Sequence, residues 1–284
     1  MSSTQSSPNK KQKVDATTTI PTIQGLEDYS FRDGEEITPH GAMPQKKYYR
    51  SRAHANPLSF NDNLTYPTKP DDFDWQPYYP ELPSSSSAPT VIDIGCGFGG
   101  LTVELSTLLP DATVLGLEIR AKVCEYVRLR IMSLRETEKG NYKNAACMRS
   151  NTMKNLVNYM HPNSLNKIFI CFPDPHFKAK NHRRRIVSYD LLTEYAYCLK
   201  PNALLYLITD VKALHEWHLE KTDAHEMFAR LSDDAMENDP CVKAMINVTE
   251  EGKKVERSGS NKYFMVYRRL PEEEVALETS EFLK

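Results

Sequence analysis

The chain has 284 residues, of which 40% are hydrophobic and 26% charged, and its formal net charge is −2. These values are typical of a globular protein with one large domain or two small ones. Global charge gives no sign of a nucleic-acid partner, no apolar run approaches the roughly 18 residues that span a bilayer, and the polar N-terminus excludes a secretory signal.

Residues 1–40 are rich in Ser, Thr, Pro, Lys and Asp and show little periodicity, which predicts a disordered tail. Within this tail, residues 8–14 (Pro-Asn-Lys-Lys-Gln-Lys-Val) form a short basic run. Two interpretations stay open, a nuclear import signal or a merely solvated tail. The expected location is therefore the nucleus, with the cytoplasm also open.

Residues 41–90 carry many prolines and aromatic residues, including Trp75, Tyr78 and Tyr79. Large rings gain most free energy when buried, so this segment is expected to pack along the domain or on a ligand. The serines at 84–87 predict a flexible connector or surface loop.

From residue 90 onward, strand and helix patterns alternate. This alternation predicts an α/β fold with a doubly wound, mostly parallel sheet. Residues 41–271 are expected to form a single domain, followed by an acidic tail over 272–284. Strands are predicted at 90–94, 113–117, 145–148, 167–172, 203–208 and 263–267, and helices at 99–108, 120–136, 152–160, 188–199 and 212–230.

The first strand runs into a glycine-rich turn at residues 95–100, and a helical pattern follows at once. Glycines permit positive φ angles and close approach of a ligand, and a helix N-terminus favours anionic or polar ligand atoms. The order Gly-x-Gly-x-Gly-Gly differs from the dinucleotide fingerprint. It resembles the first motif of S-adenosylmethionine-dependent methyltransferases.

The second strand ends at Glu118, 23 positions after Gly95. A carboxylate near this spacing can accept hydrogen bonds from both ribose hydroxyls of a nucleoside. The alternative is a surface glutamate at a strand end. After the third strand, Asn151 is expected to cap the following helix, and a contact with an adenine edge is compatible with that role.

The fourth strand runs into Phe172-Pro173-Asp174-Pro175-His176. Each proline fixes its own φ and restricts its predecessor, so the loop is stiff. A stiff loop at a strand's carboxyl end holds Asp174 over the expected cleft. An ordinary Pro-Asp-Pro turn explains neither the flanking aromatics nor the basic residues that follow.

Basic residues gather in three clusters, although the net charge is close to zero. Segregated positive charge of this kind fits a phosphate backbone, and neighbouring tyrosines suit stacking on unpaired bases. For each cluster alone, a solvated face is the alternative. The clusters are Lys46, Lys47, Arg50 and Arg52; Lys178, Lys180, Arg183, Arg184 and Arg185; and Lys253, Lys254 and Arg257.

The six cysteines are scattered and include no Cys-x-x-Cys pair. We expect buried, reduced thiols of an intracellular protein rather than disulfides or a zinc site, and no metal site is predicted.

Four segments together resemble the TrmB-like tRNA (guanine-N7)-methyltransferases, in particular the eukaryotic, fungal-type catalytic subunit. The resemblance covers about residues 44–270. Its segments are 93–99 (Asp-Ile-Gly-Cys-Gly-Phe-Gly), 116–120 (Gly-Leu-Glu-Ile-Arg), 172–178 (Phe-Pro-Asp-Pro-His-Phe-Lys) and 249–254 (Thr-Glu-Glu-Gly-Lys-Lys).

This resemblance implies a Rossmann-like class I fold with S-adenosylmethionine as cofactor, and methylation of guanine N7 at position 46 in the tRNA variable loop. It implies a WD-repeat (β-propeller) partner subunit, with the faces of the 188–230 helices, including Trp217, as candidate contact surfaces. The implied cofactor residues are Gly95, Gly97, Glu118, Ile119, Arg120, Asn151, Thr152 and Cys171; the catalytic ones are Asp174 and Glu251; and the tRNA-binding ones are Lys47, Arg50, Lys178, Arg183, Arg184, Thr249, Glu251 and Lys253.

The chain departs from the family pattern at two positions. Thr152 replaces an expected alanine, and Ala55 replaces a serine of related eukaryotic sequences, so a regulatory role of that serine would be absent here. Three alternatives stay open: a methyltransferase for another RNA or protein acceptor, a non-catalytic tRNA-binding subunit, and a nicotinamide-dependent oxidoreductase.

Overall fold

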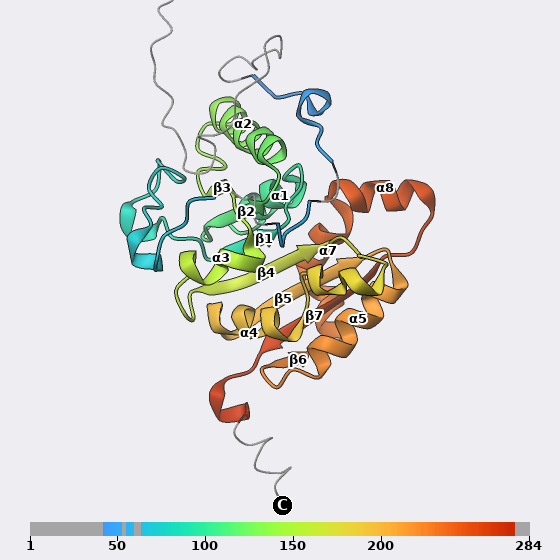
Figure 1. The fold of residues 1–284 in the computed structure, drawn as a ribbon. Coiled ribbons are helices and arrows are strands. Elements are labelled where there is room, and N and C mark those ends of the chain that lie inside the picture. The colour runs from blue at the N-terminus through green and yellow to red at the C-terminus, as the bar shows by residue number, and fades with distance from the viewer. Residues whose placement is uncertain (1–41, 53–54, 60–63, 276–284) are drawn as a thin grey trace, which may run out of the picture.

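The computed structural model describes residues 42–52, 55–59 and 64–275. The predicted N-terminal tail, its basic run and the acidic end beyond residue 275 lie outside the described residues. A seven-stranded sheet with helices packed on both faces dominates the structure (Figure 1). The expectation of a doubly wound, mostly parallel α/β sheet is confirmed.

The strand order across the sheet is β3-β2-β1-β4-β5-β7-β6. Strands β1 to β5 pair in parallel, whereas β7 lies antiparallel between β5 and β6. The chain reverses direction across the sheet between β1 and β4, which is the switch point where such sheets bind ligands. The strands are β1 Val91–Ile94, β2 Val114–Glu118, β3 Ala145–Arg149, β4 Leu165–Cys171, β5 Leu199–Thr209, β6 Phe228–Arg230 and β7 Tyr263–Arg269.

The helices include eight α-helices and four short 3₁₀ segments within the described residues. The α-helices are α1 Gly100–Leu108, α2 Ala121–Thr137, α3 Thr152–Tyr159, α4 Tyr189–Cys198, α5 Lys212–Asp223, α6 Asp233–Asn238, α7 Pro240–Asn247 and α8 Glu250–Ser258, and the 3₁₀ segments are η1 Lys46–Tyr49, η2 Pro70–Asp72, η3 Ser84–Ser86 and η4 Ala179–Arg184. No helix in this part of the chain is long and apolar enough to cross a membrane.

Alternate residues of each strand feed cores on opposite faces of the sheet. Ile92 and Ile94 of β1 pack with residues of α3 and α4, while Val91 packs with residues of α1 and α7. A third cluster places α2 over β3 with Tyr49 of η1. This alternation follows from the pleat, in which successive side chains point to opposite faces.

The aromatic N-terminal segment packs on the sheet. Of the two expectations, packing along the domain or on a ligand, the first is confirmed. Trp75, Tyr78 and Tyr79 are buried in the same core as β1 and β4. The Tyr79 hydroxyl donates to the Val114 carbonyl of β2 at 3.1 Å. The segment is therefore an integral layer of the domain. Of the predicted serine connector, Ser84–Ser86 forms η3 and Ser87 is buried.

The helix predicted over residues 212–230 was wrong in its last third. Helix α5 ends at Asp223, and Phe228–Arg230 is the edge strand β6. His225 supports the turn between them, since its Nδ1 accepts from the Met227 N–H at 3.2 Å. Helices α6, α7 and α8 had no counterpart in the predicted elements.

Candidate active site

A cavity of about 210 Å³ opens at the carboxyl ends of β1, β2 and β4, where the topology places a ligand. Most of the residues predicted from the sequence to hold the cofactor line it together. They are Gly95, Glu118, Ile119, Arg120, Asn151, Thr152 and Cys171, and Asp174 lines the same cavity.

The glycine loop begins at Gly95, which lines this cavity. Gly95, Gly97 and Gly99 all have positive φ angles, of 74°, 55° and 75°. Any side chain would be strained in this conformation, and a Cβ on Gly95 or Gly97 would meet no atom within 4 Å. Gly95 thus leaves open space where the loop lines the cavity. Gly97 belongs to the loop without lining the cavity.

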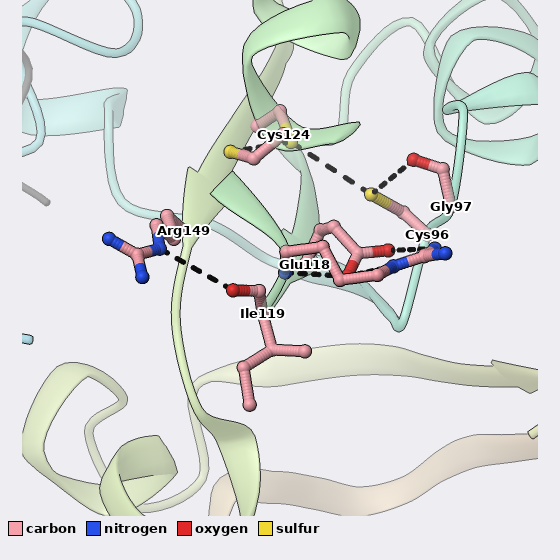
Figure 2. Close-up of polar contacts among 8 residues, drawn as sticks. Cys96, Gly97, Glu118, Ile119, Cys124 and Arg149 are labelled. Atoms are coloured by element: carbon pink, nitrogen blue, oxygen red, sulfur yellow. Dashed lines mark hydrogen bonds and ion pairs between the residues drawn. The ribbon is translucent and has the colours of Figure 1, made fainter. Parts of the chain in front are cut away.

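Glu118 is 3% exposed and is tied to its neighbour Arg120. Its Oε1 accepts from the Arg120 backbone N–H and Nε at 2.9 and 3.0 Å, and its Oε2 accepts from Nη2 at 2.7 Å. A carboxylate has about four acceptor sites, of which Arg120 uses three, so capacity for one ribose hydroxyl remains. Glu118 lies between the thiol of Cys96 and the backbone of Ile119 in Figure 2.

Asn151 is buried at the position before α3, but its side chain caps nothing. The helix-capping interpretation of this side chain was therefore wrong. Its Nδ2 instead donates to the Pro57 carbonyl at 2.7 Å. The bond brings the N-terminal segment, including Ala55 and Pro57, to the wall of the cavity.

Asp93 precedes the glycine loop and plays a structural part. The residue is 2% exposed, and the Thr102 hydroxyl donates to its Oδ2 at 2.8 Å. Burial raises the pKa of this carboxyl to about 7. The bond joins β1 to α1 and so fixes the two ends of the loop.

The loop after β4 is strained on both sides of its aspartate. Phe172 and His176 have φ angles of 49° and 44°, which are uncommon for residues with a Cβ. The His176 N–H donates to Asp174 Oδ1 at 3.2 Å, and Arg185 Nε donates to the Pro175 carbonyl at 3.0 Å. The Asp174 side chain stays 27% exposed toward the cavity. Strain retained at such a position is typical of functional loops.

The predicted tRNA-binding residues lie around this loop and elsewhere on the surface. Arg184 lines the cavity, and Phe177, Lys178 and Arg183 are exposed beside it. Phe177 is 75% exposed, the highest value among the large hydrophobic residues described.

The Thr-Glu-Glu motif begins α8. Thr249 is buried and its hydroxyl caps α8 by accepting from the Gly252 N–H at 3.0 Å. Glu251 pairs with Lys254 at 2.7 Å. Neither Thr249 nor Glu251 lines the cavity.

Several lining residues were missed by the sequence reasoning, among them His176, Met153 and Ile186. His176 carried a signal, because it belongs to the same motif as Asp174. Met153 and Ile186 carried none, since an apolar residue gives no sign from sequence that it faces a ligand.

The thiols near the site are free, as expected. Cys96 Sγ lies 3.9 Å from Cys147 Sγ, which lies 3.4 Å from Cys124 Sγ. Cys96 and Cys124 are labelled in Figure 2. A hydrogen bond with Cys147 lowers the pKa of Cys96, but burial together with the negative charges of Asp93 and Glu118 raises that pKa to about 11. The three thiols are buried and serve as packing residues.

Comparison with known proteins decides the family. A family model described as "Putative methyltransferase" matches residues 87–265. The tRNA (guanine-N7)-methyltransferase of Brugia malayi is 48% identical over 84% of this chain and 91% of its own length. The enzymes of the same name from Schizosaccharomyces pombe and Bos taurus are 47% and 45% identical, over 81% and 84% of this chain and 87% and 92% of their own lengths.

The chain belongs to the tRNA (guanine-N7)-methyltransferase family. Membership confirms the resemblance drawn from the four sequence segments, and with it the Rossmann-like class I fold.

The cavity fits the cofactor that such an enzyme needs. The open face of Gly95 admits a ligand chain close to the backbone, and Glu118 offers an acceptor for a ribose hydroxyl. Ile119 and Met153 provide apolar surface for a purine ring. These residues would hold S-adenosylmethionine.

Proposed function

We propose that this chain transfers the methyl group of S-adenosylmethionine to N7 of a guanine in tRNA, with the base seated against Asp174. One observation supports seating the guanine base against Asp174. The proline-braced Asp174 shares a cavity with the glycine loop and Glu118, and Arg184 of the basic run lines the same cavity. Donor and acceptor sides of a methyl transfer thus meet in one place.

Methyl transfer to guanine N7 requires the protein to align the two reactants and does not require a general base. Guanine N7 carries a lone pair and no proton, so its attack on a methyl group needs no proton removal. When bound, the cofactor supplies an electrophilic methyl group on a sulfonium centre. The residues around the cavity hold the two reactants in line and exclude water.

Asp174 is proposed to recognise the base. A carboxylate accepts hydrogen bonds only, and guanine offers two donors on one edge, the N1–H and the exocyclic amine. Adenine offers an acceptor at N1 and is rejected. The methylated ring is cationic, so a nearby negative charge also stabilises the charge that develops.

Glu251 is proposed as a second carboxylate on the acceptor side. In this structure it pairs with Lys254 and does not line the cavity. An RNA phosphate that binds Lys254 would compete for that ammonium group and free Glu251. Asp174 therefore carries the main role and Glu251 a supporting one.

The proposed tRNA surface combines positive charge with exposed rings. Lys178, Arg183 and Arg184 follow the Asp174 loop, and Phe177 offers a face on which a base can stack. Lys47, Arg50 and Lys253 extend the surface. From the family resemblance we propose the variable-loop guanosine at position 46 as the target, which must leave the tRNA core to enter the cavity.

The test is incubation of the chain with labelled S-adenosylmethionine and total tRNA, followed by nucleoside analysis. We expect 7-methylguanosine to be the labelled nucleoside, and its position to be found by sequencing of the product. A different labelled nucleoside would support another methyl acceptor. Tight tRNA binding without cofactor binding would support a non-catalytic subunit.

We also propose a WD-repeat partner, bound through α4. Tyr189 and Tyr197 are 45% and 51% exposed and share one face of this helix at a spacing of eight residues. Trp217, the earlier candidate, is engaged within the protein, because its Nε1 donates to the Val187 carbonyl at 2.7 Å and Arg185 stacks on its ring.

Purification of the tagged chain from its native cell tests this partner. We expect a propeller protein to co-purify with the wild type and to be lost with Tyr197→Asp. Retention of the propeller by this variant would contradict the α4 surface. The proposed nuclear location is tested by fusing residues 1–40 to a fluorescent protein, with Lys10, Lys11 and Lys13 changed to Ala as control.

A further inference from the structure

The side chain of Glu250, at the first residue of α8, meets two segments that are far apart in the sequence. Lys46 Nζ of η1 lies 2.9 Å from its Oε1, and Arg130 Nη1 of α2 lies 3.5 Å from the same oxygen. The Glu250 side chain is 31% exposed and that of Arg130 is 23% exposed. Two cations therefore converge on one half-buried carboxylate oxygen.

Arg130 carries this contact into the cofactor loop. The same Nη1 that faces Glu250 donates to the Phe98 carbonyl at 2.9 Å. Phe98 lies between Gly97 and Gly99, both in left-handed conformation. A loop of this kind has little conformational preference of its own, so a bond to its central carbonyl restricts it.

The other oxygen of Glu250 faces the start of α1. A Cβ built on Gly100 would lie 2.8 Å from Glu250 Oε2 and 2.8 Å from the Val248 carbonyl. A side chain at Gly100 would therefore displace the beginning of α8. The carboxylate also lies beside the N-terminus of α1, where negative charge is favourable. Oε1 thus reaches the glycine loop through Arg130, while Oε2 lies at the start of the helix that follows the loop.

The aromatic neighbours of Phe98 complete the arrangement. The ring of Phe98 packs edge-on against Tyr126 at 5.2 Å between centroids, and Lys46 Nζ lies 5.2 Å from the Phe98 ring centre. The side chain of Phe98 is fixed by these contacts, and its backbone by Arg130. Neither Glu250 nor Arg130 lines the cavity.

We propose that Glu250 is a positioning residue for the cofactor: it orients Arg130, which holds the Phe98 carbonyl and with it the ligand-side conformation of the glycine loop. The proposal rests on the proposed function for the identity of the ligand. Glu250 acts before methyl transfer, on the affinity for the cofactor, and does not touch the reacting atoms.

The experiment measures binding of S-adenosylhomocysteine by calorimetry to four proteins: wild type, Glu250→Gln, Arg130→Met and the double variant. We expect each single variant to bind about 3- to 5-fold more weakly, the loss typical of a partly exposed ion pair. The double variant should bind no more weakly than either single one, because both changes break the same connection.

A second readout separates positioning from loss of fold. With both substrates saturating, kcat of Glu250→Gln should stay within about 2-fold of wild type while KM for the cofactor rises. Amide exchange over residues 95–100 should quicken in the same variant. Glu256→Gln, on the same helix with a 67% exposed side chain, is the matched control and should behave as wild type.

Two results would overturn the proposal: cofactor affinity of Glu250→Gln within about 1.5-fold of wild type, or losses that add in the double variant. Failure of the wild type to bind S-adenosylhomocysteine at all would instead refute the proposed function. The two failures are therefore distinguishable in one set of titrations.

Discussion

Replacement of Asp174 by alanine probes the acceptor side of the cavity most directly. The proposed role gives this carboxylate two hydrogen bonds to guanine, each worth about 1.5–3 kcal/mol because the acceptor is charged. Their joint loss of about 3–6 kcal/mol corresponds to a fall of roughly 10² to 10⁴ in kcat/KM for tRNA.

The fold should tolerate this change. In the free protein Asp174 accepts from the His176 N–H at 3.2 Å, and its side chain is 27% exposed. Asp174 Oδ2 also lies 3.6 Å from His176 Nδ1. Loss of such contacts at a partly exposed carboxylate costs about 1–2 kcal/mol. The thermal midpoint should therefore fall by only a few degrees.

Single-turnover methylation with saturating cofactor, together with filter binding of tRNA, provides the measurement. Asp111→Ala, at an exposed aspartate after α1, is the matched control and should leave both rate and binding unchanged. If Asp174→Ala methylates within about 3-fold of wild type while tRNA still binds, the recognition role is wrong.

Three further predictions address stability, domain extent and RNA binding. The pKa of Asp93 is raised to about 7 in the native state, against 3.8 in the unfolded chain, so the native state binds this proton more tightly. The free energy of unfolding should therefore fall as the pH rises from about 4 to 7. Asp93→Asn should remove this component, up to about 4 kcal/mol, in denaturant titrations across that range, and an unchanged slope would contradict the assignment. Tyr79→Phe should lower the free energy of unfolding by about 1 kcal/mol, because it removes the hydrogen bond to β2. Tyr66→Phe, at a 53% exposed ring, is the control and should leave stability unchanged. Equal effects of the two variants would refute the integral role of the N-terminal layer. Phe177→Ala should weaken tRNA binding by about 5- to 100-fold without loss of thermal stability. Phe177→Tyr should retain tRNA binding. Wild-type tRNA binding by the alanine variant would exclude stacking.

Much of the sheet and the cofactor loop could be predicted because their signals are local. Short, mostly apolar runs marked β1 to β5, and the spacing from Gly95 to Glu118 placed both residues at one edge of the sheet. The motif around Asp174 could be recognised because its residues are consecutive in the sequence.

The end of α5 and the strand β6 could not be predicted in the same way. Strand β6 has three residues, and its place depends on pairing with β7, some forty residues later in the chain. The contact of Asn151 with Pro57 joins residues 94 positions apart. Tertiary packing determines whether the Asn151 side chain caps its own helix or donates to a carbonyl that is distant in the sequence.

The three short helices after β6 did carry local signals that were overlooked. Ser232, Asp239 and Thr249 each accept a backbone N–H at the start of a helix. Pro240 follows Asp239 at the first helical position, and two glutamates follow Thr249. These are ordinary helix-start residues.

The stiffness of the Asp174 loop has a consequence for the RNA partner. Two prolines, two residues in left-handed conformation and the bond from Arg185 leave this loop few ways to adapt. If the protein does not move, the nucleic acid must, and the energy of opening the tRNA core becomes part of the activation barrier. Substrate choice would then be determined by how easily each tRNA deforms, as much as by the bases it presents.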